Sequence, residues 1–170
     1  MTHIGLLSDT HGFVHPRAAE FFSICSEIWH AGDIGNIATA DALNAIKPLR
    51  AVHGNIDDAL VRRVYPELQV FHCEKMKVLM THIGGYPGRY NAEARKRIET
   101  EKPGLFISGH SHILKVQYDQ KFKLLHINPG AAGHSGWHRV ITFVRFVIDG
   151  DQVRDLVVFE AERNTSRFEG

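Results

Sequence analysis

The pattern of apolar and polar positions divides the chain into two halves of different texture. In the first half, short apolar runs that end in polar turns predict strands over residues 3–8, 27–31 and 49–53. Between them, apolar positions at helical spacing predict helices over residues 16–25 and 39–46. This alternation of strands and helices is typical of an α/β fold with a largely parallel sheet.

The second half is dominated by strands. The predicted strands cover residues 70–73, 76–81, 105–108, 113–118, 122–127, 140–148 and 153–159. A charged amphipathic helix is expected over residues 91–101, where Pro103 and Gly104 follow it. No shift in composition marks a boundary, so we expect a single domain over residues 1–163 and a loose tail over residues 164–170.

Composition narrows the class of protein without naming a function. The 170 residues are 44% apolar and 23% charged, close to the average for soluble globular domains, which excludes a disordered or fibrous chain. A net charge of +1 gives no strong nucleic-acid signature, and no apolar stretch approaches the roughly 20 residues that a membrane helix needs. Two cysteines, Cys25 and Cys73, are too few for a disulfide scaffold. We therefore expect a reduced, soluble, cytoplasmic domain with no membrane partner.

Histidine stands out, with 12 copies, and several of them lie in turns that follow predicted strands. The polar residues at five such strand ends are Asp9 and His11, Asp33, Asn55, His82, and His110 with His112. In an α/β sheet, ligand-binding groups collect beyond the carboxyl ends of the strands, so these side chains are expected at one edge. The i, i+2 spacing within two of the turns allows both side chains to leave on the same side.

This set of donors indicates metal binding. Carboxylate, imidazole and amide groups without thiolate suit Mn²⁺, Zn²⁺ or Fe better than Ca²⁺ or an all-oxygen Mg²⁺ site. Seven candidate ligands are too many for one ion but suit two ions that share a bridging carboxylate. Two ions roughly 3.5–4 Å apart are a familiar arrangement for displacement at phosphorus.

Taken in order, the motifs resemble those of the calcineurin-like metallophosphoesterase superfamily. The matching blocks are Asp9-x-His11, Gly32-Asp33, Gly54-Asn55, His82 and Gly109-His110-Ser111-His112, within a stretch from Leu6 to about Pro129. They are most similar to the small stand-alone bacterial and archaeal phosphodiesterases. The resemblance implies a four-layer α/β/β/α sandwich with two mixed β-sheets.

The resemblance also implies roles for the seven residues. One metal would take Asp9, His11 and His112, and the other would take Asn55, His82 and His110. Asp33 would bridge the two ions together with a hydroxide, which is the expected nucleophile. Two divalent ions are thus the implied cofactors, with Mn²⁺ first and Zn²⁺, Fe or Ni²⁺ as alternatives. The implied substrate is a small phosphate ester, a diester rather than a monoester, and a homodimer is common for this size.

One position departs from the pattern. Many superfamily members carry histidine after the asparagine, where it protonates the leaving group, but here the residue is Ile56. The proton donor is therefore left open, with His53 or His134 as the first residues to test. His134 and His138, with the glycine-rich stretch over residues 130–136, are candidates for substrate contact.

Simpler readings exist for each residue taken alone. Asp9 and Asp33 could be helix N-caps, Asn55 a turn residue, and His82 or His110 a buried structural histidine. The remaining strand histidines are expected to be structural, namely His3, His30, His53, His72 and His126. For the whole chain, the alternatives are a phosphomonoesterase of the same fold and a non-catalytic protein-interaction scaffold. One eukaryotic sorting-complex subunit of this family is such a scaffold.

Overall fold

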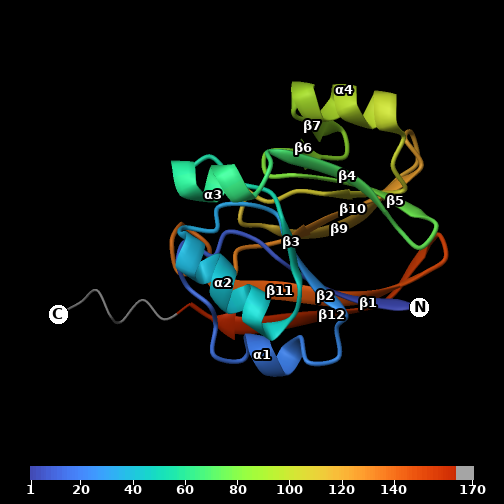
Figure 1. Ribbon diagram of the computed structural model, residues 1–170. Coiled ribbons are helices and arrows are strands. Elements are labelled where there is room, and N and C mark those ends of the chain that lie inside the picture. Colours follow the sequence, from blue (N-terminus) through green and yellow to red (C-terminus); the bar gives the residue numbers. More distant parts are fainter. Residues whose placement is uncertain (164–170) are drawn as a thin grey trace.

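Two five-stranded sheets packed face to face form the centre of the molecule, as the computed structural model shows for residues 1–163 (Figure 1). The first sheet has the order β12-β11-β1-β2-β3. Its strands are β1 (Thr2–Leu7), β2 (Glu27–His30), β3 (Leu49–Ala51), β11 (Val140–Asp149) and β12 (Gln152–Glu162). Strands β1, β2 and β3 are parallel, whereas β11 and β12 are antiparallel. The expectation of a largely parallel sheet is therefore correct only for these first three strands.

The second sheet is also mixed and has the order β4-β5-β8-β10-β9. Its strands are β4 (Leu68–Cys73), β5 (Met76–Thr81), β8 (Leu105–Ile107), β9 (Leu114–Asp119) and β10 (Leu124–Pro129). Strands β5, β8 and β10 run parallel, and β4 and β9 flank them antiparallel. Two mixed sheets with helices outside them confirm the predicted α/β/β/α sandwich.

Helices cover the outer faces of both sheets (Figure 1). They are α1 (Ala18–Phe21), α2 (Ile37–Ile46), α3 (Ala59–Val64) and α4 (Ala92–Glu101). The helix expected over residues 16–25 is much shorter than predicted, because only α1 is helical and turns follow it. Helix α3 was not expected; it begins after Asp58, whose carboxylate accepts a hydrogen bond from Val61 N at 3.0 Å. A small hairpin of β6 (Gly85–Tyr86) and β7 (Arg89–Tyr90) was not expected either.

Apolar side chains fill the space between the sheets and under the helices. From the first sheet Ile4, Leu6 and Trp29 pack against Val78, Met80 and Ile107 of the second sheet. On the outer faces, Phe22 and Leu43 pack with Ile28 and Phe143, and Ala94 and Ile98 pack with Leu79 and Phe106. This packing holds the parallel strands of both sheets in fixed register, so that their carboxyl ends meet at one edge of the sandwich.

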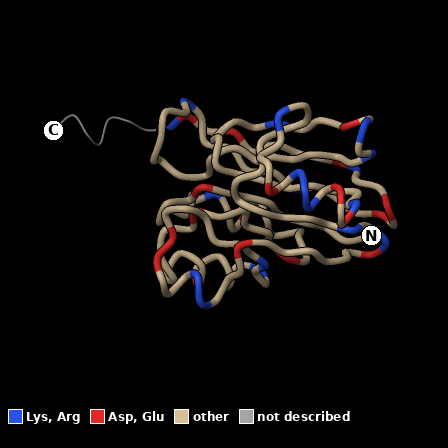
Figure 2. The backbone as a smooth tube through the Cα atoms, turned by 90° about the horizontal axis from the view of Figure 1, so that it is seen from above, with Lys and Arg blue, Asp and Glu red and all other residues tan. Residues whose placement is uncertain are grey.

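Charged residues are interspersed over the molecule, with Lys and Arg next to Asp and Glu around most of the backbone (Figure 2). Within residues 1–163, no helix has the length and apolar character to cross a membrane. The tail expected over residues 164–170 lies outside the described residues, so that expectation stays untested.

Candidate metal centre

The turns after the parallel strands bring the predicted ligands together. Two groups form in which the candidate ligand atoms all lie within 4.8 Å of one another. The first group is Asp9, His11 and His112, and the second is Asp33, His82 and His110. Their turns follow β1, β2, β5 and β8, so strands of both sheets contribute.

The first group is centred on one oxygen of Asp9. His112 Nε2 lies 3.3 Å from Asp9 Oδ1, and His11 Nε2 lies 3.9 Å from the same oxygen. The other oxygen, Oδ2, accepts hydrogen bonds from Ser8 Oγ at 2.7 Å and from His110 N at 3.1 Å. These two bonds fix the carboxylate so that Oδ1 faces the imidazoles.

Asp33 lies between the two groups. Its Oδ1 accepts a hydrogen bond from Ile56 N at 3.0 Å, which orients the carboxylate. Its Oδ2 lies 3.2 Å from Nε2 of His82 in the second group and 3.5 Å from Nε2 of His11 in the first. One oxygen therefore faces ligands of both groups, as a bridging carboxylate requires. Its 3.5 Å distance to the other group is shorter than the 3.8 Å between Asp9 Oδ1 and His82 Nε2.

Asn55 joins the second group from the turn after β3. Its Oδ1 lies 3.2 Å from His110 Nδ1, so the amide oxygen and the imidazole face each other. The structure thus brings all seven residues predicted as ligands into one edge of the molecule. The helix N-cap reading fails for Asp9 and Asp33, because no helix begins at either residue.

Several polar atoms at this edge lack hydrogen-bond partners within the described part of the chain. Asp9 Oδ1, His11 Nε2 and His82 Nε2 are buried and have no hydrogen-bond partner within residues 1–163. A buried polar atom without a partner costs about 1–3 kcal/mol, and three that converge on one place are exceptional. His82 Nδ1 donates to Ala31 O at 2.7 Å, so in the neutral ring the lone pair lies on Nε2, the atom that faces Asp33 Oδ2. Carboxylate and imidazole atoms presented in this way fit divalent metal ions.

Backbone strain is concentrated in the same residues. Five of the seven have a positive φ, a conformation that residues other than glycine rarely adopt. The angles are 54° at Asp9, 46° at His11, 56° at Asp33, 71° at His110 and 64° at His112. Left-handed conformations cost roughly 1–2 kcal/mol per residue, and such strain clusters at functional sites.

The electrostatics keep both carboxylates ionised. Burial raises the pKa of Asp9, but His112, Ser8 Oγ and His82 outweigh it and hold the pKa below its usual value. Burial likewise raises the pKa of Asp33. His82, Ile56 N and His11 outweigh this effect, so the pKa of Asp33 also lies below its usual value. Two anionic carboxylates are therefore available to cations at neutral pH.

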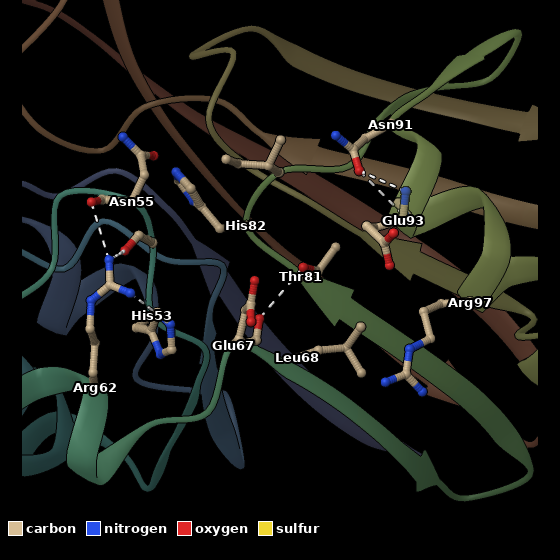
Figure 3. Close-up of a pocket in the computed structure, with 13 residues that line it drawn as sticks. His53, Asn55, Arg62, Glu67, Leu68, Thr81, His82, Asn91, Glu93 and Arg97 are labelled. Atoms are coloured by element: carbon tan, nitrogen blue, oxygen red, sulfur yellow. Dashed lines mark hydrogen bonds between the residues drawn. The ribbon is translucent and has the colours of Figure 1, made fainter.

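A cavity of about 490 Å³ opens beside the second group (Figure 3). Asn55 and His82 lie at one end of it, and Arg97 of α4 lies at the other. The complete lining is His53, Gly54, Asn55, Arg62, Glu67, Leu68, Thr81, His82, Ile83, Asn91, Glu93, Ala94 and Arg97. The cavity thus combines apolar and polar lining, carries both signs of charge, and has no Phe, Tyr or Trp among its described lining residues.

The glycine-rich stretch borders the first group. A Cβ on Gly136, whose φ is +129°, would collide with the His112 ring, so this backbone lies against a candidate ligand. The His138 ring lies 5.0 Å from the His112 ring, and its Nε2 donates to Gly133 O at 2.7 Å. Trp137, which follows this stretch, is fully exposed.

His134, the other histidine considered for substrate contact, lies within this stretch and packs on Phe13, with ring centroids 4.0 Å apart. His15, before α1, accepts a hydrogen bond from Arg17 N and packs against Phe143 and Phe159. The contact with the His112 ring makes His138 the substrate-contact candidate that lies beside a candidate metal ligand.

The candidate proton donors near Ile56 are constrained. The Ile56 side chain is 45% exposed and carries no proton to donate, although its backbone orients Asp33. His53 Nδ1 donates to Tyr65 O at 2.9 Å, so the neutral ring carries its lone pair on Nε2, which lies 3.5 Å from Arg62 Nη1.

Sequence reasoning missed the residue that ties two ligand turns together. The buried carboxylate of Asp57 accepts hydrogen bonds from Ile34 N at 3.1 Å, Gly35 N at 2.9 Å and Gly54 N at 2.8 Å. It thereby connects the turn of Asp33 to the turn of Asn55. The signal available in the sequence was its spacing two residues after Asn55, in Gly-Asn-x-Asp.

Comparison with known proteins identifies the family. Residues 2–151 match the sequence model described as the calcineurin-like phosphoesterase superfamily domain. The chain belongs to this superfamily. A probable metallophosphoesterase of Methanothermobacter thermautotrophicus is 30% identical to this superfamily member over 139 residues, which is 75% of this chain and 76% of the relative. The family resemblance carried by the motifs is therefore confirmed.

Solved structures of low sequence identity share the fold of this calcineurin-like chain. Vps29 from Entamoeba histolytica, complexed with Zn²⁺, gives a TM-score of 0.72 at 17% identity and covers 95% of this chain and 99% of its own. An archaeal phosphodiesterase gives a TM-score of 0.71 at 19% identity, with 92% and 99% covered. At these identities the likeness shows the architecture alone.

Proposed function

We propose that the protein is a dinuclear metal-dependent phosphoesterase that hydrolyses phosphodiesters. The observation that carries the proposal is the pair of ligand groups with Asp33 Oδ2 between them, 3.2 Å from His82 Nε2 and 3.5 Å from His11 Nε2. Membership of the calcineurin-like superfamily supports the phosphoesterase assignment. The archaeal phosphodiesterase of the same fold is consistent with diester substrates.

The seven residues divide between two ions. Asp9, His11 and His112 would hold one ion, the set of Asn55, His82 and His110 would hold the other, and Asp33 would contact both. Bound ions supply Lewis acidity toward phosphate oxygens and make water nucleophilic near neutral pH. Mn²⁺ is our first choice for a thiolate-free donor set, and Zn²⁺, which the Vps29 structure contains, is the second.

The protein's own contribution is orientation. Ser8 Oγ and His110 N fix Asp9, and Ile56 N fixes Asp33, so that one oxygen of each carboxylate faces the imidazoles. Ala31 O selects the tautomer of His82. Ligands held in this way keep their geometry when a phosphate ester binds across the two groups.

The cavity beside the second group would accommodate one organic group of the ester. Its lining holds Glu67 and Glu93 as well as Arg62 and Arg97, so it supplies no excess positive charge for the second negative charge of a phosphomonoester. A diester carries one charge and needs less compensation. A cytoplasmic location and homodimerisation stay predictions from the sequence.

A second candidate function is a non-catalytic scaffold, which the likeness to Vps29 structures keeps in view. Metal content and turnover separate the possibilities. The protein is stripped with chelator, reloaded with Mn²⁺ or Zn²⁺, and assayed on bis-p-nitrophenyl phosphate and p-nitrophenyl phosphate. We expect two ions per chain and faster turnover of the diester. Faster turnover of the monoester would indicate a phosphomonoesterase, and two bound ions without turnover of either would indicate the scaffold.

The presence of isoleucine at position 56 leads to a prediction about how the hydrolysis rate depends on the leaving group. Without a proton donor at this position, the rate should fall steeply as the leaving-group pKa rises, so nitrophenyl esters react well and alkyl esters poorly. Since a positioned acid contributes about 10²–10⁴-fold, Ile56→His should recover part of that factor for alkyl esters only. A flat dependence in the wild-type protein, with chemistry rate-limiting, would show that another residue donates the proton.

A further inference from the structure

Within residues 1–163, the Arg62 side chain of α3 hydrogen-bonds to one short segment and to a neighbouring histidine. Figure 3 shows Arg62 beside Asn55 and His53. Its Nε donates to Asp57 O at 2.7 Å, and its Nη2 donates to Gly54 O and Asn55 O, both at 3.2 Å. Its Nη1 lies 3.5 Å from His53 Nε2. Arg62 therefore binds three carbonyl oxygens of the turn that carries Asn55, and it has no carboxylate partner among the described residues.

The same turn is held from its other side by acidic residues. Asp57 accepts from the backbone N–H of Gly54, and Asp33 accepts from the backbone N–H of Ile56. The N–H groups of the turn thus go to carboxylates, while its C=O groups go to the guanidinium. With both sides fixed, the peptide planes on either side of Asn55 have little freedom, and the amide side chain is aimed at His110 Nδ1, 3.2 Å away.

A count of donors distinguishes this role from substrate binding. A guanidinium has five N–H donors. Arg62 commits one from Nε, two from Nη2 and one from Nη1 to the protein, which leaves a single donor for the cavity. A bidentate contact with a phosphate needs two parallel donors, so Arg62 is unsuited to clamp the substrate. Arg97, which lines the same cavity, has no hydrogen bond among the described residues and keeps its five donors.

We propose that Arg62 is a positioning residue for Asn55, and that it sets the metal affinity of the second ligand group without touching metal or substrate. The proposal rests on the proposed function, since it takes Asn55 as a metal ligand. Residues that orient ligands typically change metal affinity by about 10–100-fold when they are replaced. The effect should be larger on one ion, because within residues 1–163 Arg62 hydrogen-bonds to the turn of Asn55 and to no residue of the first group.

The neighbouring Arg63 offers a matched control. It has the same charge, lies on the same helix and is exposed, and the described part of the chain shows no hydrogen bond between it and the turn. Apo-protein prepared with chelator is titrated with Mn²⁺ alone by calorimetry, for wild type, Arg62→Met, Arg62→Lys and Arg63→Met. Melting temperatures in chelator report whether each variant is folded before metal is added.

We expect Arg62→Met to weaken the binding of one of the two ions about 10–100-fold and to change that of the other much less. Arg62→Lys, which keeps the charge but not the planar fork, should fall between wild type and Arg62→Met. Arg63→Met should titrate as wild type. Should Arg62→Met fail to fold, Arg62→Lys decides: reduced affinity for one ion supports the proposal, and wild-type affinity for both overturns it.

A double-mutant comparison assigns the affected ion. Added to His112→Ala, Arg62→Met should weaken the remaining ion further. Added to His110→Ala, it should change little, because the group that it supports is already broken. Equal weakening in both backgrounds, or equal titrations for Arg62→Met and Arg63→Met, would overturn the proposal. A wild-type protein that binds two ions but hydrolyses no ester would contradict the proposed function and leave the role of Arg62 standing.

Discussion

The two ligand groups use similar donors but are supported by different means. In the first group, the glycine-rich stretch lies against the His112 ring, and packing of backbone on imidazole holds the ligand in place. In the second group, Asn55 depends on a turn whose carbonyls and N–H groups are held by the charged residues Arg62 and Asp57. The second group also borders the cavity. We infer that substitutions in the glycine-rich stretch act mainly on the first group, whereas substitutions at Arg62 or Asp57 act mainly on the second.

Replacing Asp33 should affect metal binding at both ligand groups. Because Asp33 Oδ2 faces ligands of both groups, Asp33→Ala should weaken both ions together and reduce kcat/KM by more than the roughly 10–100-fold typical of residues that only orient ligands. Metal content after gel filtration and steady-state rates on bis-p-nitrophenyl phosphate measure this. A variant that retains two tightly bound ions and a near-native rate would remove Asp33 from the bridging position.

Replacing single histidines should separate the groups. His112→Ala should weaken one ion and His110→Ala the other, each by more than about 10-fold, since a ligand is lost rather than its support. Both variants should stay folded and regain activity at higher Mn²⁺. The check is Mn²⁺ titration together with melting curves in chelator. Loss of stability without a change in metal dependence would mark these residues as structural histidines.

The packing that supports the first group can be tested at a glycine. Gly136→Ala would push a Cβ into the His112 ring, so we expect about 10-fold weaker binding of one ion. Gly88→Ala is the control, because Gly88 also has a positive φ of 88° but has no atom near its Cβ position. Gly88→Ala should cost only the strain of about 1 kcal/mol in stability, with metal binding unchanged. Equal metal affinities for the two variants would show that the stretch does not support His112.

His126, which lies outside both ligand groups, makes the free energy of unfolding depend on pH. Burial lowers the pKa of His126 from 6.5 to about 4, with Lys115 adding to the effect and Phe106 O opposing it. The folded protein therefore keeps His126 neutral while the unfolded chain takes up a proton, so stability falls as pH drops from 6.5 toward 4. At 1.36 kcal/mol per pKa unit, the loss from this residue is roughly 3 kcal/mol.

His126→Phe should remove that part of the pH dependence. Urea unfolding of wild type and variant between pH 7 and pH 4 measures the difference. The wild-type protein should lose more stability than the variant over this interval, and both should retain the contribution of His30, whose pKa burial likewise lowers to about 4. Parallel curves for the two proteins would contradict the assignment.

The seven candidate ligands could be predicted from sequence because each lies in a turn directly after an apolar run. The local pattern of apolar residues predicts a strand and where it ends. The resemblance to a family then predicts which ion each ligand binds. The support of the ligands could not be predicted in this way. Arg62 and Asp57 act through backbone atoms of other turns, and a side chain that binds a carbonyl oxygen leaves no mark in hydrophobic periodicity.

The errors in the fold have similar causes. The position of β11 beside β1 depends on pairing between residues about 140 apart in the chain, which no local pattern encodes. Helix α1 ends after four residues although apolar residues continue at helical spacing. Phe22 and Cys25 are buried in the core without being part of a helix, so their spacing reflects burial alone. Trp137 shows that a large apolar residue in a loop need not be core.

The two tryptophans differ in solvent exposure and can therefore serve as intrinsic fluorescence probes. Trp29 is fully buried between the sheets, and Trp137 is fully exposed beside His138. Their emission should therefore separate into a blue component that iodide does not quench and a red-shifted component that it does. Because Gly136, next to Trp137, lies against the His112 ring, we expect binding at the first group to alter the red-shifted emission, while Trp29 serves as an internal reference in the same unmodified chain.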